Sequence, residues 1–250
     1  MQQRRLELPA FPNELPFKAI SQWFASLEDF GKKQDHRILL CIDEFERLET
    51  YFPGDKRDLL KLMGLFRATI QHRRYLRLLV SGATQFDELD TVWSDHFINV
   101  QELQIGFLDQ ATSLALLKKP IPEFPDEAIS HAVAEAIFER VNGQPYLLQL
   151  YAYLLVNDLN DANRTQANLE DVPQIEKKVL KQARNYFENI YKSTPKPVQT
   201  ILEQLAFEQA PAIDLPSRRW LKRRYLLNEQ EKIAIPVFNA WIHRQFEADF

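Results

Sequence analysis

The sequence predicts an α/β fold in which a short parallel sheet is followed by an all-helical region and a small mixed unit. An apolar run over Arg37–Ile42, continuous from Ile38, and a second short apolar run over Leu76–Val80, which contains Arg77, flank one segment with helical periodicity. Strand, helix and strand at this spacing favour a right-handed crossover between parallel strands. From Asp109 onward the apolar residues recur with the helical period, until a short strand is predicted near the end of the chain.

The composition is that of an ordinary globular protein and excludes several functional classes. Hydrophobic residues make up 45% and charged residues 26% of the 250 residues, and the formal net charge is −4. This charge argues against a protein that binds nucleic acid with its whole surface. The single cysteine excludes an internal disulfide and a zinc site built from several thiolates.

The sequence shows no membrane-spanning or secretory segment. The apolar run Ile38–Ile42 is far shorter than the about 20 residues that a spanning helix needs. The N-terminal residues lead into Pro9, Pro12 and Pro16 and not into an apolar signal core. We therefore expect no membrane partner and a cytoplasmic location.

Residues 1–35 are predicted to form an extended arm and one helix. The prolines in residues 1–16 exclude a helix there, because proline fixes φ and lacks the N–H donor. Apolar residues then recur with the helical period over Phe17–Phe30, and we expect Gly31–Asp35 to end that helix.

Residues 36–108 are predicted to hold the sheet. The two apolar runs are expected to form strands buried on both faces, as in parallel sheets covered by helices. Between them, Asp58–Tyr75 has the helical period. A third strand is predicted around Asn99–Ile105.

Residues 109–192 are predicted to form a helical lid domain. Asp109 and Asp126 are placed to cap the first two helices through their carboxylates. Asn142–Pro145 contains a glycine and a proline that interrupt the helical pattern. The helices are expected before Pro120, up to about Arg140, over Pro145–Leu159 and over Val172–Tyr191.

Residues 193–250 are predicted to form a winged-helix domain that begins with the linker Ser193–Pro197. The order helix, helix, short strand, helix and the small size are typical of such a domain. The predicted elements are helices over Val198–Glu208, Ser217–Tyr225 and Val237–Phe246, and a strand over Lys232–Ile235.

Two adjacent carboxylates, Asp43 and Glu44, follow the first apolar run. Ligands of open α/β sheets bind beyond the carboxyl ends of the strands, so we expect both acids at that crevice. An aspartate there can hold Mg²⁺ through water, and an ionised glutamate can polarise an attacking water. The alternative is that the pair only caps the following turn.

Small hydroxyl residues, Ser81 and Thr84, follow the second apolar run. A polar residue at this tip can contact the γ-phosphate of a bound nucleotide or orient the attacking water. The alternative is that both residues only form a turn and cap the next helix.

Three motifs occur in an order that resembles the AAA+-related STAND ATPases of prokaryotes, close to their archaeal-ATPase and NACHT-like branches. They are Ile-Asp-Glu-Phe-Glu-Arg-Leu from Ile42, Val-Ser-Gly-Ala-Thr from Val80 and Asn-Gly-Gln-Pro-Tyr-Leu-Leu-Gln from Asn142. The segment Ile233–Ile242 is similar to the end of their winged-helix domain. The resemblance implies an incomplete parallel P-loop NTPase sheet, then a helical lid domain and a winged-helix domain.

The resemblance also implies roles for single residues, with ATP and Mg²⁺ as cofactors. Asp43 matches the Walker B magnesium aspartate and Glu44 the catalytic glutamate. Either Ser81 or Thr84 lies near the first sensor position. The remaining pair, Gly143 and Pro145, matches a Gly-x-Pro turn beside the nucleotide base, although a helix C-cap glycine followed by a helix-starting proline explains this pair equally.

The sequence departs from this family in its glycines. None of the six glycines forms Gly-x-x-x-x-Gly-Lys-Ser/Thr or Gly-x-Gly-x-x-Gly, so the phosphate-binding loop is missing. Without its amides and lysine, the β- and γ-phosphates lose most of their ligands. We therefore expect a C-terminal part of a longer ATPase, with an unfilled strand position in its sheet and weak or no binding of ATP. The alternative is a degenerate ATPase that has lost the loop.

The sequence thus predicts a nucleotide-dependent molecular switch that works with other domains of the full-length protein and can form a homo-oligomer. One alternative is a non-hydrolysing scaffold or interaction module. Another is a winged-helix regulator that binds DNA through a basic cluster, for which a solvated or interdomain face is the simpler interpretation. That cluster consists of Arg218, Arg219, Lys222, Arg223 and Arg224.

Overall fold

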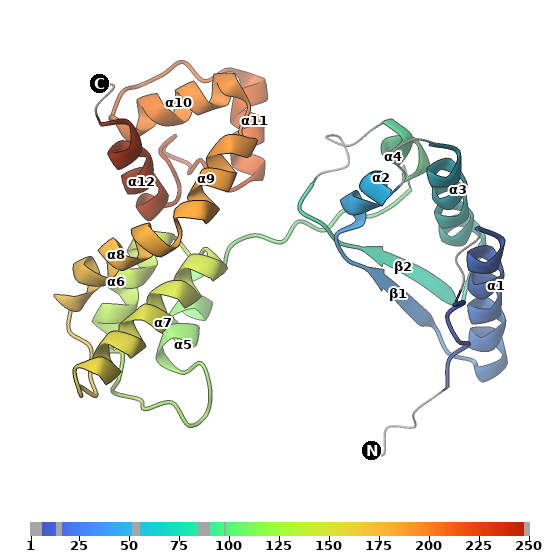
Figure 1. Cartoon of the computed structure of the whole chain (residues 1–250), viewed down its shortest axis with the longest axis horizontal. Helices are drawn as coiled ribbons and strands as arrows, with labels where there is room; N and C mark the ends of the chain where they lie inside the picture. Colours follow the sequence, from blue (N-terminus) through green and yellow to red (C-terminus); the bar gives the residue numbers. More distant parts are fainter. Residues whose placement is uncertain (1–6, 14–16, 52–55, 85–90, 98, 248–250) are drawn as a thin grey trace. The chain divides into compact units, whose positions relative to one another are not determined.

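The computed structural model describes residues 7–13, 17–51, 56–84, 91–97 and 99–247. The chain divides into two compact units, Met1–Leu103 and Gln104–Phe250 (Figure 1). Each unit is described by itself below.

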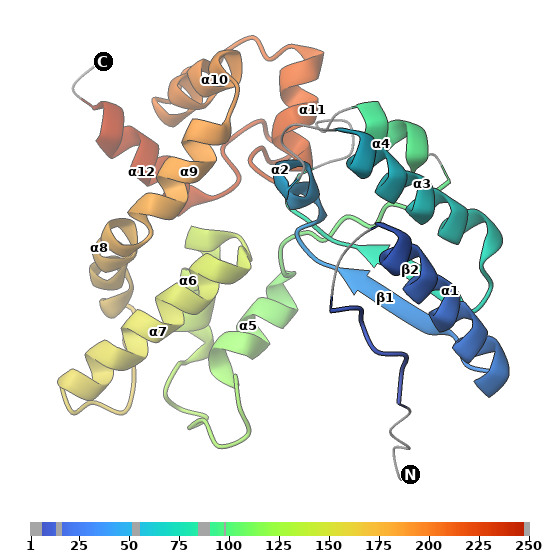
Figure 2. The same ribbon diagram turned by 45° about the vertical axis from the view of Figure 1, so that its right-hand side comes forward.

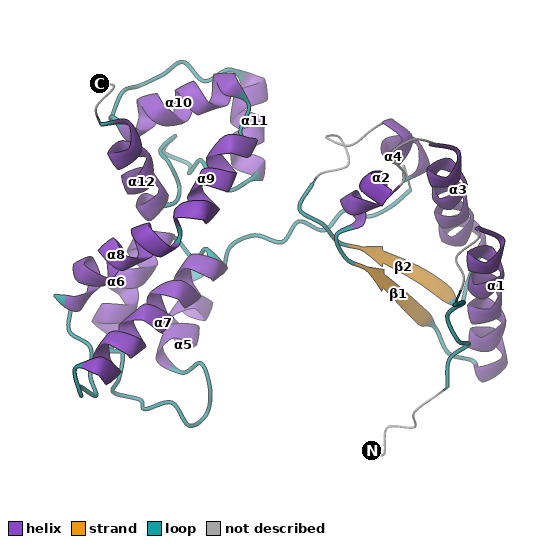
Figure 3. Cartoon of the chain, viewed as in Figure 1, coloured by secondary structure: helices purple, strands orange, loops and turns teal. Residues whose placement is uncertain are grey.

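The first unit is a parallel strand pair with helices around it. Strands β1 (Ile38–Ile42) and β2 (Leu76–Val80) pair in parallel, and helix α3 (Lys56–His72) lies between them in sequence (Figure 3). Their register runs from Ile38 opposite Leu76 to Ile42 opposite Val80. The other elements are α1 (Phe17–Gln34), the 3₁₀ turn η1 (Phe45–Arg47), α2 (Leu48–Tyr51) and α4 (Thr91–His96).

Helices α1 and α3 cover one face of the strand pair (Figure 1 and Figure 2). Ile38, Leu40 and Ile42 on this face pack against the buried core of the unit. On the opposite face Leu39 and Leu79 are 59% and 44% exposed, and Cys41 is exposed as well. The prediction of strands buried on both faces was therefore wrong, because side chains alternate along a strand and, among the described elements, helices pack on one face alone.

Helix α1 ends at Gln34, within the predicted Gly31–Asp35, and Asp35 takes the left-handed conformation that follows its last residue. One other expectation for this unit was wrong. No strand forms at Asn99–Ile105 in the described structure, where Leu103 and Ile105 are 71% and 91% exposed. This segment spans the boundary between the units, and a strand is stable only when a neighbouring strand satisfies its backbone groups.

The second unit is helical and has one continuous core. Tyr151, Phe187 and Phe238 are completely buried in it, and the rings of Phe187 and Phe238 stack with centroids 5.7 Å apart. Its helices are α5 (Gln110–Lys118), α6 (His131–Val141), α7 (Pro145–Asp161), α8 (Asp171–Gln182), α9 (Arg184–Ser193), α10 (Lys196–Ala206), α11 (Leu215–Arg223) and α12 (Pro236–Phe246).

Caps decide where these helices begin. Asp109 caps α5 as predicted, and its carboxylate accepts from the Thr112 N–H at 2.7 Å. Asp126 does not cap α6; it pairs with Lys119 at 2.6 Å, and Ser130 is the cap residue. Both are capping residue types, and the later start of the helix selects the serine.

Two more boundaries differ from the sequence-based expectation. The single helix predicted over Val172–Tyr191 is divided at Ala183 into α8 and α9. In place of the strand predicted over Lys232–Ile235, one antiparallel bridge joins Leu227 and Ile233. Within the described residues, no helix combines the length and the hydropathy that crossing a membrane requires.

Candidate functional site

Asp43 and Ser81 lie side by side just beyond the carboxyl ends of β1 and β2. The Ser81 N–H donates to the Ile42 carbonyl at 2.9 Å, which extends the strand ladder by one residue. The Ser81 hydroxyl donates to Asp43 Oδ1 at 2.7 Å, and the Glu44 N–H donates to the same oxygen at 3.0 Å. The parallel register thus brings together two side chains that are 38 residues apart in sequence.

These two donors stabilise the ionised form of Asp43. The hydrogen bond from Ser81, and after it the one from the Glu44 backbone, lowers the pKa of the Asp43 carboxyl. Both donors favour the ionised form, since a carboxylate accepts hydrogen bonds more strongly than a carboxylic acid. Asp43 is exposed and negatively charged at neutral pH, as a residue that attracts a hydrated cation must be.

Glu44 is next to Asp43 but is held by another residue. Its backbone is left-handed, with φ of 51° and ψ of 44°, which is uncommon for a residue other than glycine. Its Oε2 accepts from Arg47 Nη1 at 2.6 Å, and this hydrogen bond raises the pKa of Arg47. The side chains of Arg47 and Glu44 are 60% and 59% exposed, so the ion pair is weak and exchanges readily with water.

Sequence reasoning did not find Glu46, which positions the segment after β2. Its Oε1 accepts from the Ala83 N–H at 3.0 Å, while Oε2 is buried and has no hydrogen-bond partner among the described residues. A Cβ on Gly82 would lie 2.0 Å from that Oε2 and 2.8 Å from the Phe45 ring. A side chain at position 82 would therefore displace Glu46 or Phe45 from the observed arrangement, and the only signal in the sequence was the glycine itself.

Thr84 is half-buried in the bend after Ser81. In the part of the chain that the structure describes, no hydrogen bond joins its side chain to Asp43, whereas Ser81 makes one. Of the two predicted sensor residues, the structure therefore brings Ser81 to the acidic pair and leaves Thr84 outside this hydrogen bonding.

Gly143 and Pro145 belong to the second unit, where they join α6 to α7. Gly143 has a φ of +72°, and a Cβ there would lie 2.0 Å from the Leu108 carbonyl oxygen. The Leu108 N–H donates to the Gly143 carbonyl at 2.9 Å, and Pro145 takes the first position of α7. This geometry is that of a glycine at a helix end followed by a proline that starts the next helix. A role of Gly143 and Pro145 beside a nucleotide base stays a prediction.

A metal ion at Asp43 would take its other ligands from the phosphates of a bound nucleotide and from water. Among the described residues no group of three histidine, cysteine or acidic side chains could hold a metal ion. Mg²⁺ in nucleotide sites takes one or two protein ligands and completes its shell with phosphate oxygens and water. The exposed carboxylate of Asp43 fits that limited role, and this site fits a metal that arrives together with phosphates.

Comparisons with known proteins identify the fold. No family model matches the chain, and no curated protein matches it. A Walker-type ATPase of Pyrococcus abyssi superposes with a TM-score of 0.59 and 18% identity, over 90% of this chain and 68% of that chain. Two single-residue mutants of RuvB from Thermotoga maritima superpose with TM-scores of 0.45 and 0.41, each at 18% identity, over 88% and 87% of this chain and 67% of theirs.

The similarity to the Walker-type ATPase shows that this chain has an ATPase-like fold. At 18% identity it shows the fold alone, because unrelated functions recur on one fold.

Proposed function

We propose that this chain is the Walker B and helical part of a nucleotide-dependent switch related to the AAA+ and STAND ATPases. One observation carries the proposal: in an ATPase-like fold, the ionised carboxylate of Asp43 is held by Ser81 at the carboxyl edge of parallel strands. This edge is where α/β sheets bind their ligands. The location we propose is the cytoplasm.

Each of the residues at this edge would have a different role in ATP hydrolysis. Asp43 would hold the hydrated Mg²⁺, which supplies charge neutralisation for the β- and γ-phosphates when ATP is bound. Glu44 would leave Arg47 and accept the proton of the attacking water, which its exposed ion pair permits. Ser81 would orient the Asp43 carboxylate through its hydrogen bond and favour its ionised form.

The second unit would supply the response to the nucleotide. Gly143 and Pro145 would contact the base, and residues 193–250 would act as a winged-helix part whose docking differs between the two nucleotide states. Other domains of the full-length protein, or further copies of the chain, would receive the signal.

The 250 residues contain no glycine-rich phosphate loop, so that loop would have to come from outside them. The DNA upstream of the codon for Met1 shows whether the reading frame encodes one. By themselves the 250 residues should bind ATP·Mg²⁺ no better than weakly. A micromolar dissociation constant for this chain alone would contradict the requirement for an external loop.

The catalytic assignment is tested in the protein encoded by the whole reading frame. We expect Glu44→Gln to lower the hydrolysis rate by about 10²-fold or more, because the base is lost, while ATP binding stays intact. Steady-state phosphate release and binding of labelled ATP measure the two effects. Glu123→Gln is the control, because Glu123 is exposed in the second unit and lies outside the proposed site.

Unchanged turnover in Glu44→Gln would remove Glu44 from the catalytic role. A reading frame without a phosphate loop, combined with no measurable hydrolysis, would favour the second candidate function, a non-hydrolysing scaffold. The absence of the loop motif from the 250 residues is the observation that keeps this candidate open.

A further inference from the structure

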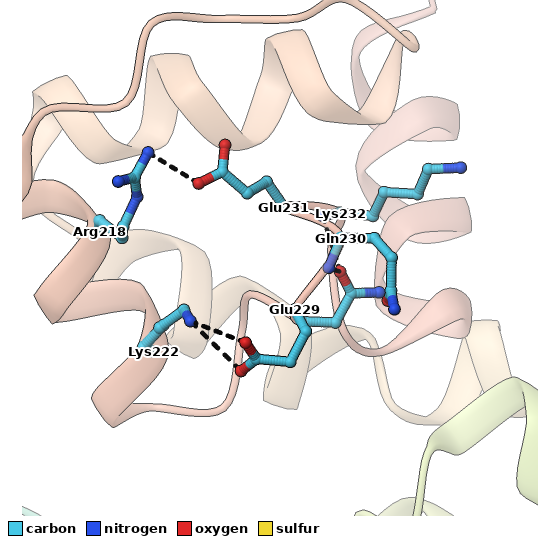
Figure 4. A network of polar contacts seen from close by, with 7 residues as sticks. Arg218, Lys222, Glu229, Gln230, Glu231 and Lys232 are labelled. Carbon is cyan, nitrogen blue, oxygen red and sulfur yellow. Dashed lines mark hydrogen bonds and ion pairs between the residues drawn. The ribbon is translucent and has the colours of Figure 1, made fainter.

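Helix α11 and the residue that follows it carry a dense cluster of basic residues. Five of the eight residues from Ser217 to Arg224 are arginine or lysine. Two of these cations are occupied by carboxylates of the turn Asn228–Lys232, which we name the acidic turn (Figure 4). Arg218 Nη2 lies 2.7 Å from Glu231 Oε1, and Lys222 Nζ lies 3.2 Å from Glu229 Oε2.

The acidic turn is built to hold these carboxylates in place. Asn228 Oδ1 accepts from the N–H groups of Gln230 and Lys232, at 3.0 and 2.9 Å. The Asn228 N–H donates to the Lys232 carbonyl at 2.9 Å, which closes the turn. Glu231 has a φ of 56°, a left-handed conformation that costs energy for a residue with a side chain.

Other cations near the acidic turn are not neutralised by it. Arg219 is exposed, and the structure gives it no ion pair with any described residue. The side chain of Lys232 points away from both ion pairs (Figure 4). The surface therefore remains positive around the two occupied cations.

We propose that the α11 surface binds the phosphate backbone of duplex DNA, and that the acidic turn is an intramolecular competitor for its cations. A carboxylate on an arginine or lysine makes the contact that a phosphate oxygen would make. The paired side chains are 39% to 84% exposed, so solvent weakens both ion pairs and a stronger polyanion can replace them. Duplex DNA suits this surface better than a single acidic side chain of a peptide does. Its regularly spaced phosphates can replace both carboxylates of the acidic turn at once and can also contact Arg219.

In this arrangement DNA binds weakly until it displaces the acidic turn from Arg218 and Lys222. The chain carries a net charge of −4, so its overall charge does not draw it to a polyanion, and a local basic cluster such as that of α11 has to supply the attraction. While the acidic turn holds Arg218 and Lys222, the remaining cations make few phosphate contacts. Displacement of the turn adds two contacts and steepens the dependence of affinity on salt.

The test measures binding of a fluorescently labelled DNA duplex to the 250-residue chain by anisotropy across a series of salt concentrations. We expect the double variant Glu229→Gln and Glu231→Gln to bind about tenfold more tightly than the unchanged chain near 0.1 M salt. Its plot of log affinity against log salt should be steeper by about two units, one for each cation released. Thermal unfolding of the same variant shows whether the fold survives the change.

A matched control separates local release from a change in net charge. Glu123→Gln with Glu139→Gln removes the same two charges from exposed positions elsewhere in the second unit, and should leave the affinity nearly unchanged. When Arg218→Gln and Lys222→Gln are added to the double variant, the gain should disappear.

Three outcomes would overturn the proposal. Equal tightening in the control pair would mean that net charge alone governs binding. An unchanged affinity and salt slope in a folded double variant would mean that the acidic turn does not compete. Binding of poly-glutamate as tight as binding of the duplex would assign the surface to an acidic protein partner.

Discussion

The pKa of the Asp43 carboxyl is lowered because one hydroxyl and one backbone amide donate hydrogen bonds to it. Ser81 supplies the hydroxyl at 2.7 Å and Glu44 the amide at 3.0 Å. Neither donor is charged, so the effect depends on short distance and alignment and not on the long-range field. Removal of one donor should therefore change the pKa measurably without disturbing the strands.

We expect Ser81→Ala to raise the pKa of Asp43 from its lowered position toward the ordinary value of an aspartate. The reason is that the larger of the two stabilising hydrogen bonds is lost. Carboxyl carbon chemical shifts of Asp43, followed by NMR across acidic pH, measure the effect.

Thr84→Ala is the control for this titration, because Thr84 makes no hydrogen bond to Asp43 in the described structure. Its titration of Asp43 should match that of the unchanged protein. A shift in Thr84→Ala as large as that in Ser81→Ala would contradict the assignment of Ser81 as the partner.

At the scale of elements, Glu28 and Gly31 of helix α1 fix how this helix packs against the strand pair. Glu28 on this helix accepts from the N–H groups of Arg74, Tyr75 and Leu76, at 2.9, 3.0 and 2.7 Å. Burial raises the pKa of Glu28, but these three hydrogen bonds outweigh it and the net shift is downward. The helix thus holds the start of β2 in place.

Gly31 allows the same helix to lie close to the strands. A Cβ on Gly31 would be 2.7 Å from the His36 carbonyl oxygen and 2.8 Å from the Cβ of Tyr75, both attached to the backbone. We expect Gly31→Ala to lower the free energy of unfolding of the first unit by about 1–3 kcal/mol, because the backbone must move apart. Urea denaturation monitored by tryptophan fluorescence measures this change.

Gly64→Ala is the matched comparison, since Gly64 also lies inside a helix of the first unit but a Cβ there would meet nothing within 4 Å. Alanine should be neutral there or stabilise by about 0.5–1 kcal/mol, because it restricts the unfolded chain. Equal effects of the two substitutions would show that packing against the strands does not decide the role of Gly31.

At the scale of the whole molecule, each unit has its own hydrophobic core. The core of the first unit includes Met63 and Trp93, and the core of the second includes Tyr151 and Phe238. The boundary lies between Leu103 and Gln104, where residues 101–107 belong to no helix or strand. A separate core for each unit is what allows a unit to fold independently.

We expect limited proteolysis with thermolysin to cut first near Leu103 and Ile105, whose side chains are 71% and 91% exposed on irregular backbone. Mass spectrometry should identify two fragments that meet there, and circular dichroism should show that each remains folded. Leu103→Ser with Ile105→Ser removes the residues the protease prefers and should slow this cut. A first cut inside α6 or α7 would contradict independent folding of the second unit.

Local patterns in the sequence were sufficient to predict most of the elements. The strands Ile38–Ile42 and Leu76–Val80 and the cap at Asp109 were predicted correctly, because an apolar run or a cap depends on residues within one or two turns of each other. The sequence also placed Asp43 and Ser81 at strand ends, from which their proximity follows once the strands are parallel.

The tertiary structure decided what depends on distant residues. Whether a strand face is covered, whether residues 99–105 find a partner strand, and whether Glu46 packs over Gly82 are set by contacts that the local pattern does not contain. The same is true of the acidic turn, whose glutamates reach the cations of α11 only through the fold. The physical reason is that hydrogen bonds and ion pairs need a geometry of a few tenths of an ångström, which only the folded backbone fixes.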